Sequence, residues 1–199
     1  SFSTKILRAQ PFRASDYLGP LSIFDSWNEQ SSSGPKAFTL SENGEVKCDY
    51  GRAYKTDYKG SEHPAFDSIL VPGGRGRKNI ENIAWAVNLL KNNEQQCSHI
   101  LSVCTGAFLL KDARLIDGKD VTTHHFALKE LEDYGNATVK KDLSFVSSDR
   151  VWSSAGVYCG SKMALAFIKS FEGYQNSEGN TLDGDYQKVL NAVQHDEVF

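Results

Sequence analysis

Short apolar runs alternate with longer segments of helical periodicity along this chain. Eight runs have the length and composition of strands, at residues 5–9, 37–40, 45–48, 67–71, 99–103, 121–123, 145–147 and 151–153. Six segments are typical of helices, at residues 17–27, 80–90, 108–110, 126–134, 157–171 and 186–193. Such alternation indicates parallel strands joined by crossover helices. The pattern predicts an α/β fold, a three-layer sandwich with helices on both faces of a mostly parallel central sheet.

Two further features of the pattern concern local pairing and domain organisation. Asn43-Gly44 lies between the runs at 37–40 and 45–48. Because Asn-Gly is a strong turn signal, we expect these two runs to pair as a hairpin. Residues 173–199 form a polar, glycine-rich loop followed by a short C-terminal helix, and no internal repeat divides the chain. The sequence therefore predicts a single domain over residues 1–199.

The run at 99–103 ends in the sequence Ser102-Val103-Cys104-Thr105-Gly106, which a predicted helix follows. Small residues two positions on either side of a nucleophile permit the tight strand-to-helix turn of a nucleophile elbow. A thiol at a helix start also faces unpaired backbone N–H groups and the positive end of the helix dipole. The pattern therefore predicts that Cys104 is a nucleophile with a lowered pKa.

Three other cysteines, Cys48, Cys97 and Cys159, lack this combination of strand, small neighbours and helix start. Packing is their expected role, because cysteine is among the most buried residue types. The four cysteines form no CxxC pair and no metal-binding spacing with histidine, which is typical of free thiols in a reducing compartment. His124 and His125 make a poor metal pair, since neighbouring strand residues point to opposite faces. No metal is expected.

The net charge and the length of the apolar stretches limit the kinds of partner that the protein can bind. Lys plus Arg number 22 against 25 Asp plus Glu, a net charge of −3, whereas nucleic-acid binding needs clustered basic residues. The apolar stretch at 100–110 is too short for the roughly 20 residues of a membrane span, and residues 1–7 lack the core of a secretory signal. We expect a cytoplasmic protein that binds neither nucleic acid nor a membrane. The glycine-rich turn at 73–76 lacks the Gly-Lys-Ser/Thr of a phosphate loop, so no cofactor is expected.

Five motifs in order, spread over nearly the whole chain, resemble the ThiJ/PfpI superfamily. They are Val71-Pro72-Gly73-Gly74, Ser102-Val103-Cys104-Thr105-Gly106-Ala107, Leu115-Ile116-Asp117-Gly118, Thr122-Thr123-His124 and Ser154-Ala155-Gly156. The resemblance implies a flavodoxin-like fold of the glutamine amidotransferase-like class. The segment at 16–20, Asp-Tyr-Leu-Gly-Pro, is similar to the isonitrile hydratase branch and to related AraC-type regulators. Protease and glutaminase relatives carry histidine directly after the nucleophile, and Thr105 at that position argues against both activities.

The resemblance also implies roles for individual residues. The family places an acidic residue beside the thiol, so Asp16 is expected to contact Cys104, where a carboxyl can shuttle a proton. From local sequence alone, Asp16 is more typical of a helix cap than of a catalytic acid. His124 is equally typical of an ordinary polar residue at a strand end. The candidate catalytic residues are Cys104, Asp16, Thr105 and His124. The candidate oxyanion- and substrate-binding residues are Gly73, Gly74, Thr105 and Gly106.

Three functions remain open. In a hydratase of isonitriles, Cys104 attacks the isocyanide carbon, Asp16 protonates it, and water releases an N-substituted formamide. In a glyoxalase- or deglycase-like enzyme, Cys104 adds to an α-oxoaldehyde and His124 moves protons. A module that senses ligands or oxidants without turnover is the third. Relatives are commonly homodimers, so a homodimer with a small-molecule substrate is expected. The chain ends at Phe199 without paired helix-turn-helix units, so direct DNA binding is not expected.

Overall fold

A seven-stranded sheet forms the centre of the protein in the computed structural model, which describes residues 3–7, 12–31, 34–173 and 184–196. Its strands are β1 (Ser3–Leu7), β2 (Lys36–Ser41), β5 (Tyr58–Lys59), β6 (Ser68–Val71), β7 (His99–Val103), β10 (Phe145–Ser148) and β11 (Val151–Ser154). They lie in the order β10-β11-β7-β6-β1-β2-β5. Every neighbouring pair is parallel except β10 and β11.

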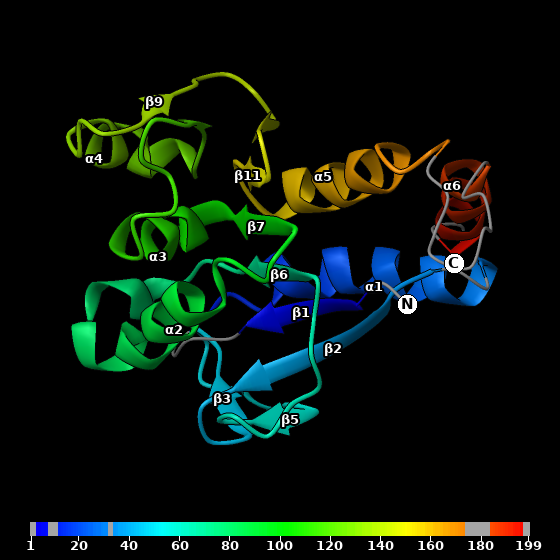
Figure 1. Cartoon of the computed structure of the whole chain (residues 1–199), viewed down its shortest axis with the longest axis horizontal. Coiled ribbons are helices and arrows are strands. Elements are labelled where there is room, and N and C mark those ends of the chain that lie inside the picture. Colours follow the sequence, from blue (N-terminus) through cyan, green and yellow to red (C-terminus); the bar gives the residue numbers. More distant parts are fainter. Residues whose placement is uncertain (1–2, 8–11, 32–33, 174–183, 197–199) are drawn as a thin grey trace.

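Helices cover both faces of this sheet. In Figure 1, α2, α3 and α4 lie on one side of the strands, and α1, α5 and α6 lie on the other. The bounds are α1 (Ser15–Gln30), α2 (Ile80–Asn93), α3 (Ala107–Asp112), α4 (Leu128–Glu132), α5 (Val157–Lys169) and α6 (Asp185–Asp196). Short 3₁₀ turns are η1 (Arg75–Lys78), η2 (Cys104–Gly106) and η3 (His125–Ala127). The predicted three-layer α/β sandwich is confirmed.

Strand β6 illustrates how the apolar runs build the core. Ile69 and Val71 belong to the cluster of buried side chains that includes α2 and α3, whereas Leu70 belongs to the cluster that includes α1 and α5. Successive strand residues point to opposite faces, so a central strand between two helical layers must be apolar at each position. This requirement explains why Ile69, Leu70 and Val71 form an unbroken apolar run, and all three are buried.

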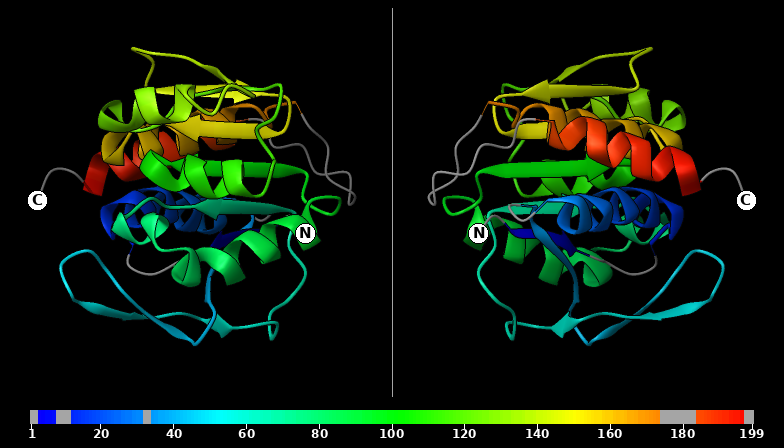
Figure 2. Two further views of the ribbon diagram at one scale, coloured as in Figure 1. Left: turned by 90° about the vertical axis from the view of Figure 1, so that its left-hand side faces the viewer. Right: turned by 90° about the vertical axis from the view of Figure 1, so that its right-hand side faces the viewer.

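The predicted hairpin between residues 37–40 and 45–48 is wrong. Strand β2 has parallel neighbours on both sides, β1 and β5. Strand β3 (Glu45–Lys47) pairs instead with β4 (Ala53–Lys55), an antiparallel partner that the apolar pattern did not reveal. The turn itself forms, with Gly44 at φ 80°, but it leads the chain out of the central sheet. Figure 2 shows this cyan segment extending from the layers at one end of the molecule.

Other predicted elements differ mainly at their ends. The strand predicted at 99–103 coincides with β7, while the one predicted at 121–123 shortens to β8 (Asp120–Val121). Strand β8 pairs with β9 (Thr138–Val139) in a separate two-stranded sheet. Residues 8–9 of the first predicted strand and 174–183 of the polar loop lie outside the described residues. Among the helices of the described residues, none is long and apolar enough to cross a membrane.

The sheet connections change direction at β1. Strand β2 lies on one side of β1, while β6, β7 and β11 lie on the other. In open α/β sheets, ligands bind beyond the carboxyl ends of the strands at such a switch point. The start of α1, the loop after β6 and the turn after β7 meet there and carry Asp16, Gly73 and Cys104. The topology thus brings together residues that are far apart in the sequence.

Candidate active site

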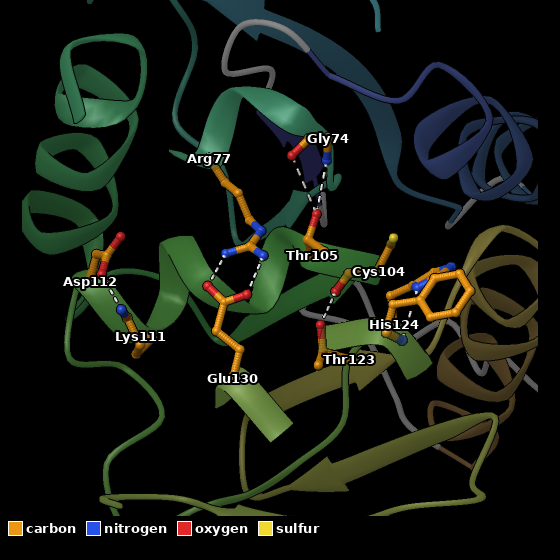
Figure 3. Close-up of polar contacts among 10 residues, drawn as sticks. Gly74, Arg77, Cys104, Thr105, Lys111, Asp112, Thr123, His124 and Glu130 are labelled. Atoms are coloured by element: carbon orange, nitrogen blue, oxygen red, sulfur yellow. Dashed lines mark hydrogen bonds and ion pairs between the residues drawn. The ribbon is translucent and has the colours of Figure 1, made fainter. Parts of the chain in front are cut away.

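Cys104 occupies a strained turn between β7 and α3 (Figure 3). Its φ is 56°, a left-handed conformation that costs a residue with a side chain on the order of 1 kcal/mol. The Thr123 hydroxyl donates to the Cys104 carbonyl oxygen at 2.8 Å and so holds the turn in place. A Cβ on Gly106 would lie 2.1 Å from the Val71 carbonyl oxygen, so glycine is needed for the turn to pack against β6. These contacts form a nucleophile elbow.

Asp16 lies in the first turn of α1 with no exposed surface. It does not cap the helix, because the N-cap position is Ala14 and no side chain caps it. The Gly73 N–H donates to Asp16 Oδ2 at 3.2 Å. The other oxygen, Oδ1, is buried and has no hydrogen-bond partner among the described residues. The carboxyl lies close enough to the Cys104 thiol for each group to perturb the ionisation of the other.

Burial decides the protonation state of this pair. It raises the pKa of Asp16 to about 6, although contact with Cys104 and the charge of Arg13 oppose the shift. Burial and the Asp16 charge raise the pKa of Cys104 to about 12, against the effect of the Thr105 N–H. The predicted lowering of the thiol pKa is therefore wrong, because burial and a neighbouring carboxylate outweigh the helix start. At neutral pH the proton lies on sulfur, and Asp16 is the adjacent base.

The four candidate oxyanion- and substrate-binding residues have different roles in the structure. The Gly74 N–H, a candidate oxyanion donor, already donates to Thr105 Oγ1 at 3.0 Å (Figure 3). Gly73 donates its N–H to Asp16, and Gly106 is buried against Val71. Only the Thr105 N–H, among these four groups, is directed at the Cys104 sulfur. The structure thus places Gly73 and Gly106 behind the site, where they position other residues.

A cavity of about 220 Å³ opens in front of the thiol. Its wall includes Gly74, Cys104, Thr105, His124 and Phe126. His124 is the N-cap of η3, where its Nδ1 accepts the Phe126 N–H at 3.4 Å. Burial, followed by the charges of His125 and Arg13, lowers the pKa of His124, so this imidazole is neutral at pH 7. The structure therefore brings all four candidate catalytic residues to one site.

Sequence reasoning missed the basic part of the cavity wall and the role of Thr123. Arg13, Arg75, Arg77 and Lys78 line the cavity together with Asp49. Arg13 precedes α1, the other three basic residues lie in η1, and Asp49 comes from a third segment. Each basic residue alone resembles an ordinary surface charge. Thr123 is part of the Thr-Thr-His motif, which was a signal for it. Among the described residues, no group of three or more His, Cys, Asp or Glu side chains could hold a metal ion.

Replacing Asp16 with asparagine is expected to stabilise the protein above pH 6. The native pKa of about 6 exceeds the ordinary value of 3.8, so the stabilising proton is fully bound below about pH 4 and is lost as the pH rises through 6. At pH 7.5 the wild type carries a buried charge that Asp16→Asn lacks, a difference of about 1–3 kcal/mol. Thermal melts should show a Tm gain of several degrees at pH 7.5 and little at pH 4. An equal gain at both values would contradict a raised Asp16 pKa.

Gly73→Ala is expected to damage both stability and activity. A Cβ there would lie 2.6 Å from the Thr105 nitrogen and 2.9 Å from Asp16 Oδ2, and relieving such overlap costs about 1–3 kcal/mol. We expect a Tm several degrees lower and at least a tenfold loss of turnover, because both neighbours flank the thiol. Gly156→Ala is the matched comparison for stability, since its Cβ would meet only His124 Cδ2, at an ordinary contact distance of 3.7 Å. Wild-type turnover in Gly73→Ala would show that this close approach is unimportant.

Comparisons with known proteins agree with this architecture. A sequence profile of the DJ-1/PfpI family matches residues 5–170. Isonitrile hydratase of Pseudomonas putida is 28% identical over 123 residues, which cover 62% of this chain and 53% of that protein. The glutathione-independent glyoxalase DJR-1.2 of Caenorhabditis elegans is 29% identical over 130 residues, 64% of this chain and 68% of that protein. The match thus spans about half the length of the hydratase.

Solved structures show the same fold at low sequence identity. Drosophila melanogaster DJ-1beta superposes with a TM-score of 0.79 at 17% identity, covering 98% of each chain. An AraC family transcriptional regulator from Pseudomonas putida superposes with a TM-score of 0.77 at 15% identity, covering 97% of this chain and 100% of that one. With the elbow cysteine after β7 and the acidic residue on α1, the profile match over most of the sequence shows that this chain belongs to the DJ-1/PfpI family.

Proposed function

We propose that this protein hydrates a small isonitrile to an N-substituted formamide. The observation that carries the proposal is the buried Asp16 carboxyl beside the Cys104 thiol, with one carboxyl oxygen unpartnered among the described residues. An isonitrile carbon must accept both a nucleophile and a proton, and this pair supplies the two from neighbouring side chains. Similarity to the Pseudomonas putida isonitrile hydratase supports the same chemistry.

The first step joins Cys104 to the substrate. As sulfur attacks the terminal isonitrile carbon, the thiol proton passes to the Asp16 carboxylate. The carboxyl then returns that proton to the same carbon, which gives a thioimidate, R–N=CH–S–Cys104, and leaves Asp16 ionised. The Thr105 N–H, which faces the sulfur, stabilises negative charge that develops there. No proton enters or leaves the site in this step.

The second step consumes one water molecule. Asp16 takes a proton from the water as its oxygen adds to the thioimidate carbon, and the proton passes to the substrate nitrogen. The carbon–sulfur bond of the tetrahedral adduct then breaks, the hydroxyl proton returns to sulfur, and R–NH–CHO is released. The sum is one isonitrile plus one water giving one formamide, with Cys104 and Asp16 restored to their starting states.

A glyoxalase-like reaction is the second candidate, because His124 lines the same cavity as Cys104. The Cys104 thiol would add to the aldehyde of an α-oxoaldehyde, and the neutral imidazole would carry the proton between the two carbons of the adduct. Similarity to the Caenorhabditis elegans glyoxalase favours this alternative. The order of preference rests on Asp16, because proton transfer by His124 does not require this carboxyl.

Parallel assays of para-nitrophenyl isocyanide and methylglyoxal separate these functions. Formamide formation, followed by chromatography and NMR, is the expected result. Turnover of methylglyoxal alone would replace the first proposal with the second. Turnover of neither compound would favour a sensing role, in which Cys104 is oxidised to the sulfenic or sulfinic acid without catalysis. Mass spectrometry after brief peroxide treatment would then locate the oxidised cysteine.

A further inference from the structure

The wall of the cavity in front of Cys104 carries an excess of positive charge. Arg13, Arg75, Arg77 and Lys78 line it, against the single carboxylate of Asp49. A net charge of −3 for the whole chain makes this concentration of basic residues a local feature. Clefts lined by one sign of charge concentrate ligands of the opposite sign. The arrangement therefore points toward an anionic ligand.

One of these cations is already neutralised within the protein. The Arg77 guanidinium donates two hydrogen bonds to the Glu130 carboxylate, at 2.8 and 2.7 Å (Figure 3). The same group lies 3.8 Å from the centroid of the Phe108 ring. Such a bidentate, stacked arginine holds the wall together and has little capacity left for a ligand. The charge available to a ligand belongs to Arg13, Arg75 and Lys78.

Arg13 lines the same cavity as the thiol and makes only a loose ion pair with Asp49. Its Nη2 lies 3.6 Å from Asp49 Oδ2, beyond hydrogen-bond distance, and its side chain is 34% exposed while that of Asp49 is 1% exposed. Asp49 Oδ1 is engaged by the Arg75 backbone N–H at 3.0 Å. The Arg13 backbone N–H donates to the Gly73 carbonyl oxygen at 2.8 Å, which anchors the residue to the loop beside the site. Asp49 thus directs the guanidinium without saturating its five donors.

Arg13 also lies within electrostatic reach of the reacting groups. Its charge lowers the pKa of Asp16 and of Cys104, in each case as a smaller effect than burial. It also contributes to the lowered pKa of His124. An anion held by this guanidinium would therefore have its other end within the cavity that exposes the thiol.

We propose that the substrate is a small isonitrile bearing a carboxylate, which Arg13 binds while the isonitrile carbon reaches Cys104. Arg75 and Lys78, both exposed, add positive charge at the same wall. A cavity of about 220 Å³ is smaller than the pockets that hold drug-sized ligands, so the substrate is compact. Guanidinium and carboxylate groups pair in a bidentate geometry, which makes Arg13 a determinant of specificity. This inference rests on the proposed hydratase function.

Isocyanoacetate and its neutral methyl ester test the inference directly. We expect the wild type to favour the acid at least tenfold in kcat/KM, the scale of a charge-assisted hydrogen bond. Arg13→Gln should remove most of this preference, which is the quantity to compare because the loss of its charge near Asp16 and Cys104 acts on acid and ester alike, whereas Arg13→Lys should retain part of it. Arg114→Gln is the matched control, since it removes one exposed positive charge away from the cavity wall. A preference for the acid that persists in Arg13→Gln would overturn the inference.

A binding measurement keeps this inference distinct from the proposed function. Calorimetry with the formamide products, N-formylglycine and its methyl ester, needs no turnover. Tighter binding of the acid by the wild type, lost in Arg13→Gln but kept in Arg114→Gln, supports the carboxylate site. Equal affinity for acid and ester overturns it. Absence of turnover with both isonitriles overturns the hydratase proposal, whatever the products show.

Discussion

Cys104→Ala should abolish hydration of para-nitrophenyl isocyanide, with a loss of about 10⁴-fold or more. The thioimidate cannot form without the sulfur, and removal of a covalent nucleophile commonly costs several orders of magnitude. Because the loss acts on chemistry, kcat should fall while binding of the formamide product remains. Steady-state formamide production and calorimetry on the same preparation provide the two measurements.

Controls distinguish loss of the nucleophile from loss of the fold. Cys104 adopts φ 56°, a strained conformation that alanine must share, so the variant needs a thermal melt beside its assay. Cys159→Ser is the matched variant, because Cys159 is half-buried on α5 and is absent from the cavity wall. It should keep near wild-type turnover. Formamide production that survives Cys104→Ala would exclude the thioimidate mechanism.

Much of the fold follows from local sequence, as β7 illustrates. Its bounds at His99 and Val103 match the predicted strand, because an apolar run ends at residues suited to a tight turn. The partner of β3 was not accessible in the same way. The Asn-Gly turn correctly marks a reversal, but a turn does not specify which strand will pair across it. In the folded protein β1 and β5 pair with the two edges of β2, so β2 has no free edge for β3.

The candidate site was also predictable only in part. The elbow at Cys104 is a local pattern and was predicted from the residues around it, whereas the contact with Asp16 joins positions far apart and depended on the family resemblance. The direction of the Cys104 pKa could not be inferred from a helix start, since burial and the Asp16 charge arise only in the folded protein. Arg13 was missed for the same reason, because nothing nearby in the sequence indicates that it faces the thiol.

Asp16→Asn should lower kcat for isonitrile hydration by roughly 10²- to 10⁴-fold, the range typical of a general acid–base residue. Asparagine is similar in size and can still accept the Gly73 N–H through its amide oxygen. It cannot take the thiol proton, whose removal is otherwise difficult because the pKa of Cys104 is about 12. The fold should remain intact, which the Tm gain expected for this variant at pH 7.5 would verify independently.

The pH profile identifies Asp16 as the base more specifically than the size of the loss. The carboxyl must be ionised to receive the Cys104 proton, and its pKa is about 6. In the wild type, kcat/KM should therefore rise with pH through about 6 and then stay level across the neutral range, because the thiol itself ionises only near 12. In Asp16→Asn the step near 6 should disappear, and residual activity should increase with hydroxide toward high pH. A wild-type profile that falls above pH 6 would mean that the protonated carboxyl starts the reaction, and the order of proton transfers would have to be reversed.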